Sequence, residues 1–246
     1  MFKFDDFFGK KILKSSIIDN AFFTTRDFVL HPGTLENLDD TCAENRAFLK
    51  KNLGVSNLYT AKQVHGTNVV IAHSSEEIYE NCDGIVLTEP SSACFLNFAD
   101  CIPLILYDKK LDIGAVLHAG WRGTVANIAS VGVKKLVSLG SLPKNIFAVI
   151  GPGIGKCCFE TGIDVAEKTF EVLAGNSDFI DFKDKNVKFC IDLKKVNEIL
   201  LRKEGVTDID VSDYCTSCKN GVFFSYRREN KNTARHSAVL RLKRDL

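Results

Sequence analysis

Short apolar runs separated by turn residues dominate the middle of the chain. They fall at residues 58–65, 68–72, 84–88, 92–98, 102–107 and 112–118, and some are separated by Gly66–Asn68, Asp83–Gly84 and Asp108–Asp112. Runs of this length with such boundaries predict buried β-strands. The first 30 residues are rich in phenylalanine and show shorter alternating patches, which predict edge strands packed on another layer.

Four segments carry the signals of helices. Thr41 and Glu44 have the spacing of a capping box, apolar residues follow at helical intervals, and Gly54 ends the segment. The other predicted helices cover residues 122–139, 163–174 and 194–204, and Gly205 ends the last. Further strands are predicted at residues 146–150, 189–193, 223–228 and 237–242.

Helices interrupt the strands after residue 120, and the chain contains no internal repeat, low-complexity tract or linker. This order predicts an α/β (α+β) fold in which helices flank a mixed β-sheet. With 246 residues and 45% hydrophobic side chains the chain can bury a sizeable core, so we expect residues 1–246 to form a single compact domain.

The charge of the chain is balanced, since 32 basic and 31 acidic residues give a net +1 at pH 7. This balance favours neither nucleic acid nor a membrane as a partner. No apolar run reaches the roughly 18 residues of a spanning helix. The acids among the first residues do not fit a signal peptide, and we expect a cytoplasmic protein.

Nine cysteines, an odd number in a chain of this length, do not form a disulfide framework. In a reducing compartment most of them should be thiols. Burial as small hydrophobic core residues is the interpretation for Cys42, Cys82, Cys94 and Cys190.

Two cysteine pairs lie in the second half of the chain. Cys215 and Cys218 form one CxxC motif, and Cys157 and Cys158 are adjacent. The pairs could meet in space, but their spacing does not match a zinc ribbon. We interpret both as structural or incidental thiols, with redox activity as the lesser alternative.

Two histidines and one cysteine stand beside predicted strand ends or glycine turns. His65 and His118 each end a predicted strand, and Cys101 precedes another. Two imidazoles and one thiolate leave the fourth tetrahedral position of a zinc ion open, which is typical of a catalytic site where bound water has a pKa of about 7. The three residues are therefore candidate ligands of one metal ion.

The same three residues allow two other interpretations. Their spacing is not regular, and two hydrogen-bonded histidines with a buried thiol are the more common arrangement on composition alone. Cys101 could also be a nucleophile activated by His118 and supported by Asp100 or Gln63, as in cysteine hydrolases.

Several nearby residues suit an anionic or aromatic ligand. Trp121, the single tryptophan, could stack on a flat ring or fill the core. Gly151–Gly155 follows a predicted strand but lacks the sequence of either nucleotide-binding glycine loop, so it is interpreted as a tight turn. Arginine pairs well with phosphate oxygens, and the basic residues nearest the motifs are Arg46, Arg122, Arg227 and Arg228.

Six motifs occur in a specific order, and they are Gln63–Gly66, Ala99–Pro103, His118–Gly123, Ile150–Gly155, Cys215-Thr216 and Phe224–Arg228. From about residue 20 to the C-terminus the chain resembles the YfiH family, also called the multicopper polyphenol oxidoreductase or laccase-like family. Its members include purine nucleoside phosphorylases, a laccase-domain protein of mammalian macrophages and a peptidoglycan-editing factor.

The resemblance implies a compact α/β fold related to the cytotoxic necrotizing factor type of cysteine hydrolase, with a zinc site at His65, Cys101 and His118. It implies phosphorolysis of adenosine, inosine, guanosine and methylthioadenosine, and deamination of adenosine. Copper is the alternative ion, as in a polyphenol oxidase. Three ligands for one ion nevertheless match poorly the several copper centres that a laccase needs.

On this basis we expect the three metal ligands and Asp100 to be catalytic, with Asp100 transferring a proton to the leaving ammonia. The partners would be purine nucleosides and phosphate, and the chain would be a monomer or a small homo-oligomer. Two rival functions are a metal-independent cysteine hydrolase or peptidoglycan-precursor editor, and a non-catalytic partner-binding protein. Substrate binding is expected of Gln63, Trp121, Arg228, Arg46 and Arg122, the last two as a phosphate clamp.

Three positions depart from the family pattern. The loop His31–Leu38 is shortened, Cys82 stands where alanine usually precedes Asp-Gly, and Thr233–Arg235 carries alanine in place of glycine. These changes leave the candidate ligands intact and bear on substrate preference.

Overall fold

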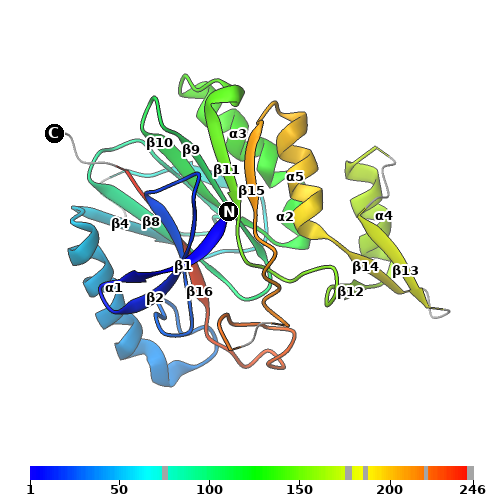
Figure 1. Cartoon of the computed structure of the whole chain (residues 1–246), viewed down its shortest axis with the longest axis horizontal. Helices are drawn as coiled ribbons and strands as arrows, with labels where there is room; N and C mark the ends of the chain where they lie inside the picture. Colours follow the sequence, from blue (N-terminus) through cyan, green and yellow to red (C-terminus); the bar gives the residue numbers. More distant parts are fainter. Residues whose placement is uncertain (74–76, 175–178, 185–187, 219–220, 243–246) are drawn as a thin grey trace.

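The computed structural model describes residues 1–73, 77–174, 179–184, 188–218 and 221–242 (Figure 1). Two β-sheets pack face to face around a shared apolar core, and helices cover their outer sides. A third, smaller sheet and one helix form a lobe at one side of this body.

The first sheet has seven strands, which are β1 (Phe2–Phe7), β2 (Lys10–Ser15), β3 (Ala21–Thr24), β4 (Asn57–Ala61), β6 (Ile78–Tyr79), β8 (Ser92–Phe98) and β16 (His236–Arg241). Their order is β1-β2-β3-β16-β8-β4-β6. Strands β1 to β3 and β16 pair antiparallel, whereas β4 pairs parallel with both β8 and β6. The sheet is therefore mixed, and the strand from the C-terminal end lies at its centre.

The second sheet has six strands, which are β5 (Val69–Ile71), β7 (Gly84–Leu87), β9 (Ile102–Asp108), β10 (Ile113–Ala119), β11 (Ile146–Ile150) and β15 (Asp208–Val211). Their order is β15-β11-β9-β10-β7-β5. The pairs β15–β11 and β7–β5 are parallel and the others antiparallel, so this sheet is mixed as well.

The central strands bury both of their faces. In β9, Ile105 points into the layer between the two sheets, whereas Leu104 and Leu106 lie in the cluster beneath the helices. In β8, Leu96 faces the same inner layer and Phe95 faces away from it. Burial on both sides explains why these runs are apolar throughout, and each large side chain contributes about 1.5–3 kcal/mol.

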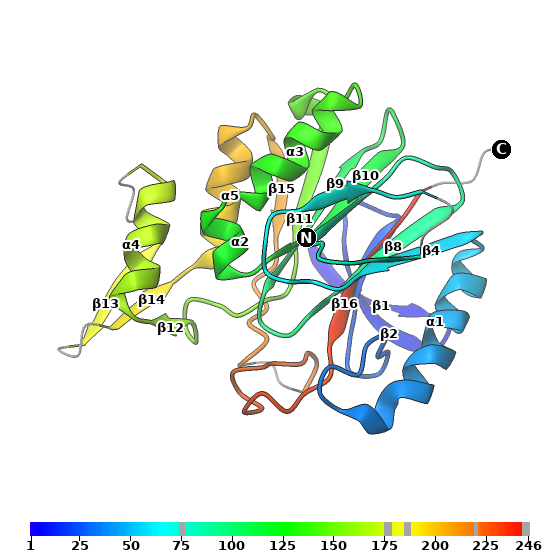
Figure 2. The same ribbon diagram turned by 180° about the vertical axis from the view of Figure 1, so that it is seen from behind.

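Helices cover both outer faces (Figure 2). Helices α2 (Trp121–Val125), α3 (Ile128–Ser138) and α5 (Leu193–Lys203) pack on the second sheet, and α1 (Asp39–Leu53) packs on the first. The contact of α3 is closest at Gly132, where an added Cβ would lie 2.4 Å from Leu117 Cδ1. A larger residue at Gly132 would push the helix off the sheet.

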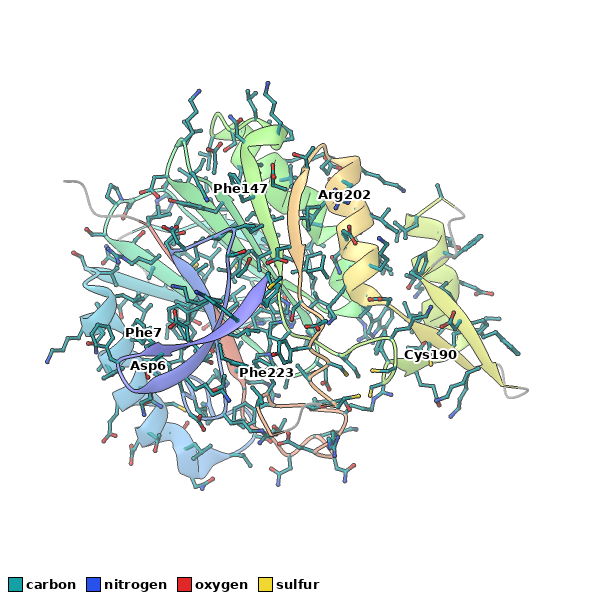
Figure 3. The ribbon with its side chains drawn as sticks, in the orientation of Figure 1. Asp6, Phe7, Phe147, Cys190, Arg202 and Phe223 are labelled. Carbon is teal, nitrogen blue, oxygen red and sulfur yellow. The ribbon has the colours of Figure 1, made fainter. Side chains whose placement is uncertain are left out.

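The lobe consists of α4 (Ile163–Val172), β12 (Glu160–Thr161), β13 (Ile180–Asp184) and β14 (Lys188–Ile191). Its strands follow the order β12-β14-β13, and Figures 1 and 2 show it protruding beside α5. In Figure 3 the labelled Cys190 lies in the lobe and Phe223 lies in the body. The chain returns to the body at Asp192, which caps α5 by accepting a hydrogen bond from Lys195 N at 3.0 Å.

The single helix predicted at residues 122–139 was wrong, because two helices occupy that segment. Asn127, between α2 and α3, has φ 61°, in the left-handed region that stops a right-handed helix. Its side chain accepts a hydrogen bond from Ser130 N at 3.1 Å and so caps α3.

The predicted capping box at Thr41 was also wrong. Helix α1 begins at Asp39, directly after a 3-10 turn at Glu36–Leu38, so Thr41 lies inside the helix. Asp39 and Asp40 in the first turn favour this start through the helix dipole. Gly54 ends α1 with φ 63°, as predicted.

The strand predicted at residues 223–228 is a turn. Ser225 N donates to Glu229 Oε1 at 3.1 Å, and Arg227 N donates to Asp100 Oδ2 at 2.7 Å. Side-chain carboxylates take these amide hydrogens, so the segment does not pair as a strand.

The strand predicted at residues 58–65 was too long, because β4 ends at Ala61 and His65 lies in a loop with φ 64°. Four strands were not predicted. Two of them, β6 and β12, have only two residues each, and the other two, β13 and β15, are rich in aspartate.

The predicted α/β fold with helices flanking mixed sheets is confirmed, although three sheets occur where one was expected. Cys42, Cys82 and Cys94 are buried as predicted, whereas Cys190 is only half-buried. Within the described ranges, no helix combines the length and the apolar character that crossing a membrane needs.

Candidate metal centre

The three candidate ligands lie together at one end of the paired sheets. One ligand atom from each of His65, Cys101 and His118 lies within 4.8 Å of the others. His118 is on β10 opposite Pro103 of β9, and Cys101 immediately precedes β9. The two imidazole rings meet at 78° with centroids 4.8 Å apart. Folding therefore brings together two rings and a sulfur from three separate segments.

Asp83, which is fully buried, holds two of these residues in place. Its Oδ1 lies 2.8 Å from His118 Nδ1 and accepts a hydrogen bond from His65 N at 2.9 Å. Its Oδ2 accepts hydrogen bonds from Gly66 N at 2.7 Å and Val64 N at 3.2 Å. Because Nδ1 of His118 is engaged by Asp83, Nε2 is the ring nitrogen that faces Cys101.

The charges of Cys101 and His118 are linked. Burial alone would raise the pKa of the Cys101 thiol, but the charge of His118 and hydrogen bonds from His118 and His65 lower it to about 6. Burial would lower the pKa of His118, but Cys101 and Asp83 raise it to about 9. Between these values a thiolate and an imidazolium face each other.

The donor set fits a metal ion. A thiolate is already favoured near neutral pH, and a cation can replace the imidazolium proton beside it. Catalytic zinc sites hold the ion with three protein ligands drawn from histidine, cysteine and carboxylates, and two imidazoles with one thiolate meet this requirement. Among the described residues, this is the one group of candidate ligands that contains histidine.

Gly120 is required by the tight packing at this centre. An added Cβ would lie 2.9 Å from His65 Cδ2 and 3.1 Å from Cys101 Sγ. The chain therefore leaves β10 without a side chain at this position, and this lets the three donors approach one another.

A cavity of about 610 Å³ opens over the three residues. Its volume is within the range of small-molecule sites, about 300–1,000 Å³. Apolar and aromatic walls come from Ile154, Phe159 and Tyr226, and polar side chains come from His31, Lys62, Gln63, Asn97, Asp100, Arg227 and Arg235.

Asp100 lines the cavity next to Cys101 and is held firmly. Its Oδ1 accepts a hydrogen bond from Thr216 Oγ1 at 2.7 Å, and its Oδ2 accepts one from Arg227 N at 2.7 Å. Its own backbone has φ 94°, outside the usual range for a residue with a side chain. The carboxylate therefore has a fixed position at the rim of the metal centre.

The expected substrate-binding residues are only partly brought to this cavity. Gln63 lines it, but both ends of its amide are bonded to the backbone of Asn97, at 2.8 and 2.9 Å. Arg46 lines a neighbouring hollow and donates to Leu30 O at 2.9 Å. Trp121, Arg122 and Arg228 are not among the residues that line the cavity within the described ranges.

Contacts elsewhere account for these three side chains. Trp121 packs against the core beneath the helices, and the Arg122 guanidinium lies 4.4 Å from its ring centroid. Arg228 donates to the carbonyl oxygen of Ser217.

Several residues of the site were not predicted from the sequence. Asp83 was predicted only as part of a turn. The available signal was its position directly before a glycine and a buried strand. His31 and Arg235 lie in the segments that depart from the family pattern, and both line the cavity. Arg227 was noted as a basic residue but was not assigned to the site.

The fold and the site together define a protein with two packed mixed sheets and a His-Cys-His group at their ends, open to a cavity. The chain belongs to the family described as multi-copper polyphenol oxidoreductase laccase, whose model matches residues 33–243. The resemblance inferred from the motifs is confirmed.

The relatives carry names of purine nucleoside enzymes. A "Purine nucleoside phosphorylase" of Deinococcus radiodurans is 36% identical over 90% of this chain and 88% of its own length. An "Adenosine deaminase RL5" of an unknown prokaryotic organism is 32% identical over 77% of this chain and 78% of its own.

Solved structures support the fold. YlmD from Geobacillus stearothermophilus has a TM-score of 0.87 at 25% identity and covers 98% of both chains. The hypothetical protein YfiH of Bacillus licheniformis has a TM-score of 0.83 at 29% identity, covering 91% of this chain and 92% of that one.

Proposed function

We propose that this chain is a zinc-dependent enzyme of purine nucleosides. It would split adenosine, inosine, guanosine and methylthioadenosine with phosphate, and it would deaminate adenosine. The observation that carries the proposal is the group of His65, Cys101 and His118 beneath a cavity of nucleoside size. The names of the relatives support the substrate class.

His65, Cys101 and His118 would hold the ion, and Asp83 would fix the orientation of His118. When bound, zinc supplies a Lewis acid with one coordination position open to the cavity. The positive charge of the ion would also keep Cys101 ionised.

Arg227 and Arg235 both line the cavity, and the Arg235 guanidinium lies 5.8 Å from the Tyr226 ring centroid. Both guanidinium groups donate to backbone carbonyl oxygens, and each has further N–H donors that would bind phosphate. In phosphorolysis, a phosphate oxygen bonds to the ribose C1′ while the bond from C1′ to the purine breaks, and the purine keeps the electron pair and takes up a proton. Arginines can neutralise and orient the phosphate. They take the role first expected of Arg46 and Arg122.

The purine would lie against the apolar walls. Phe159 and Tyr226 present aromatic rings to the cavity, and flat bases stack on such rings. Asp100 would carry the proton, since each of its oxygens accepts one hydrogen bond and keeps further acceptor capacity. In deamination, a water oxygen bonds to C6 of adenosine and the C6–N bond breaks, so ammonia leaves with the transferred proton.

The test is turnover by zinc-loaded protein. Each nucleoside is incubated with and without phosphate, and free base, ribose-1-phosphate and inosine are followed by chromatography. His65→Ala and Cys101→Ser should abolish both activities, whereas His73→Ala, at an exposed histidine outside the site, should leave them unchanged. Absence of turnover with all nucleosides, or parent-like activity in both site variants, would refute the proposal.

A cysteine hydrolase is the second candidate, because one observation favours it. Cys101, His118 and Asp83 are ordered as a nucleophile, a base and the group that orients the base, and the pKa of Cys101 is lowered to about 6. Such an enzyme keeps its activity after chelation and loses it on alkylation of Cys101. The zinc enzyme loses its activity after chelation and regains it with zinc.

A further inference from the structure

Two cysteine pairs far apart in the sequence meet at the base of the lobe. The sulfur atoms of Cys157, Cys158, Cys215 and Cys218 all lie within 4.8 Å of one another. Cys218 Sγ is 3.5 Å from Cys157 Sγ and 3.2 Å from Cys158 Sγ. Figure 3 shows sulfur atoms, in yellow, close together between the labelled Phe223 and Cys190. We refer to these four residues as the cysteine cluster.

The backbone is arranged to bring these pairs together. Gly153 and Cys215 form a parallel β-bridge, and Thr216 N donates to Gly153 O at 3.1 Å. Gly155 N donates to Cys215 Sγ at 3.2 Å. An added Cβ at Gly155 would lie 3.1 Å from Cys215 Cβ and 3.3 Å from Cys157 Sγ. The glycine turn at residues 151–155 therefore packs directly against the CxxC loop.

We propose that the cysteine cluster binds one zinc ion in a closed site with four thiolate ligands. Zinc–sulfur bonds of about 2.3 Å place the corners of a tetrahedron about 3.8 Å apart. The sulfur separations in the cluster, from 3.2 Å to at most 4.8 Å, lie on both sides of this value. Changes of up to about 1 Å in these separations would complete the tetrahedron.

The sharing of Cys218 favours a metal over disulfides. Cys157 and Cys158 are neighbours in sequence, and both approach the same sulfur of Cys218. A disulfide to Cys218 would use only one of them, and the other would have to pair with Cys215 in a second disulfide. A metal ion engages all four sulfurs at once, and a tetrahedral set of four sulfurs is typical of zinc or iron.

A buried lysine lies beside the proposed four-thiolate zinc site, which carries two negative charges. The hollow lined by Cys157 and Cys215 holds three lysines and three acids, which are Lys156, Lys194, Lys195, Asp192, Glu198 and Asp213. The buried Lys194 ammonium donates to the carbonyl oxygens of Ser212 and Tyr214, just before the CxxC motif. A cation is therefore fixed beside the cluster, where it offsets the charge of the thiolates.

The bound ion would have a structural role, because four protein ligands leave no position open. It would join the turn at 151–158, which leads into the lobe, to the loop at 212–218. Thr216, inside the CxxC motif, holds the Asp100 carboxylate at 2.7 Å. The cysteine cluster would therefore stabilise the rim of the metal centre without taking part in the reaction.

The first test is metal content after expression with zinc, measured by mass spectrometry. Cys157→Ser/Cys218→Ser changes the two exposed cysteines of the cluster and should lower the zinc content by one equivalent per chain. Cys190→Ser, at a half-buried lobe cysteine outside the cluster, is the matched control and should retain the parent content. An unchanged zinc content in the double variant, or iron in place of zinc, would overturn the proposal.

The second test separates this site from the His-Cys-His centre. In His65→Ala/Cys101→Ser, cobalt added in place of zinc should give one equivalent with the strong thiolate-to-metal absorption of a tetrahedral four-sulfur site. Absence of this absorption, or a parent protein that contains a disulfide within the cluster and no metal there, would contradict the proposal. Failure of the enzymatic proposal would leave this absorption intact, so the two outcomes are distinguishable.

Discussion

Replacing Asp83 with asparagine should weaken both the metal centre and the fold around it. The side chain keeps its shape, but four donors surround it: His118 Nδ1 and the amides of Val64, His65 and Gly66. Asparagine offers one acceptor oxygen and turns an NH₂ group toward the other donors.

The expected magnitude follows from these contacts. About two of the four donors lose their acceptor, and each buried unsatisfied donor costs about 1–3 kcal/mol, so the free energy of unfolding should fall by about 2–6 kcal/mol. Loss of the carboxylate partner of a metal-bound histidine typically lowers metal affinity 10- to 100-fold, or by about 1.4–2.7 kcal/mol.

The assay is zinc competition against a chromophoric chelator, in a Cys157→Ser/Cys218→Ser background that removes the second proposed ion. Asp108→Asn is the matched control, since Asp108 is equally buried and accepts hydrogen bonds from the amides of Lys110 and Leu111, away from the centre. It should lose stability but keep its zinc affinity. The reasoning is refuted if Asp83→Asn binds zinc within twofold of its parent, or if both variants weaken binding equally.

Three further outcomes are expected. In metal-free protein, the rate of Cys101 alkylation should rise with pH through a midpoint of about 6, well below the pKa of an ordinary thiol, and bound zinc should protect the thiol. A midpoint near 9 would contradict the thiolate assignment. Burial lowers the pKa of His236 to about 3, so between pH 6.5 and 3 the unfolded chain binds a proton that the folded chain does not. The free energy of unfolding should therefore fall as the pH drops through this range. Urea titrations should show a smaller fall in His236→Phe than in the parent, and an unchanged fall in His73→Phe. Gly120→Ala should lower zinc affinity at least tenfold, because the added Cβ would meet His65. The melting temperature should change by only a few degrees. Unchanged zinc affinity would show that the centre is not tightly packed.

The predictable part of the fold came from the length and spacing of the apolar runs. Strands β8, β9, β10 and β11 bury both faces, so their continuous apolar runs marked them clearly. The helix break at Asn127 was not predictable from hydrophobic pattern alone, because the apolar face continues from Val125 to Ile128 across it. Only the left-handed backbone separates the two helices.

The site was predictable where a ligand-type residue stood in a recognisable motif. His65, Cys101 and His118 met this condition, and their side chains lie together. Asp83 did not, because its contacts to His118 and to the loop of His65 depend on which strands become neighbours. Arg235 reaches the cavity for the same reason, through β16 at the centre of the first sheet.

Backbone pairing between distant segments also explains why the four cysteines meet. The spacing of Cys157-Cys158 and Cys215–Cys218 matches no ribbon motif, yet the bridge between Gly153 and Cys215 brings the pairs together. They were interpreted as structural or incidental thiols, and the proposed zinc site would make them structural; the sequence could not show that the pairs meet.

The left-handed backbone at His65 and Asp100 has a consequence for evolution of this protein. Each conformation costs about 1–2 kcal/mol for a residue with a side chain, and glycine would remove that cost. At position 100 the two hydrogen bonds of the carboxylate offset this cost, but selection for heat resistance alone would favour glycine at position 65 and discard an imidazole. A directed-evolution campaign would therefore need an activity screen at every round to retain His65.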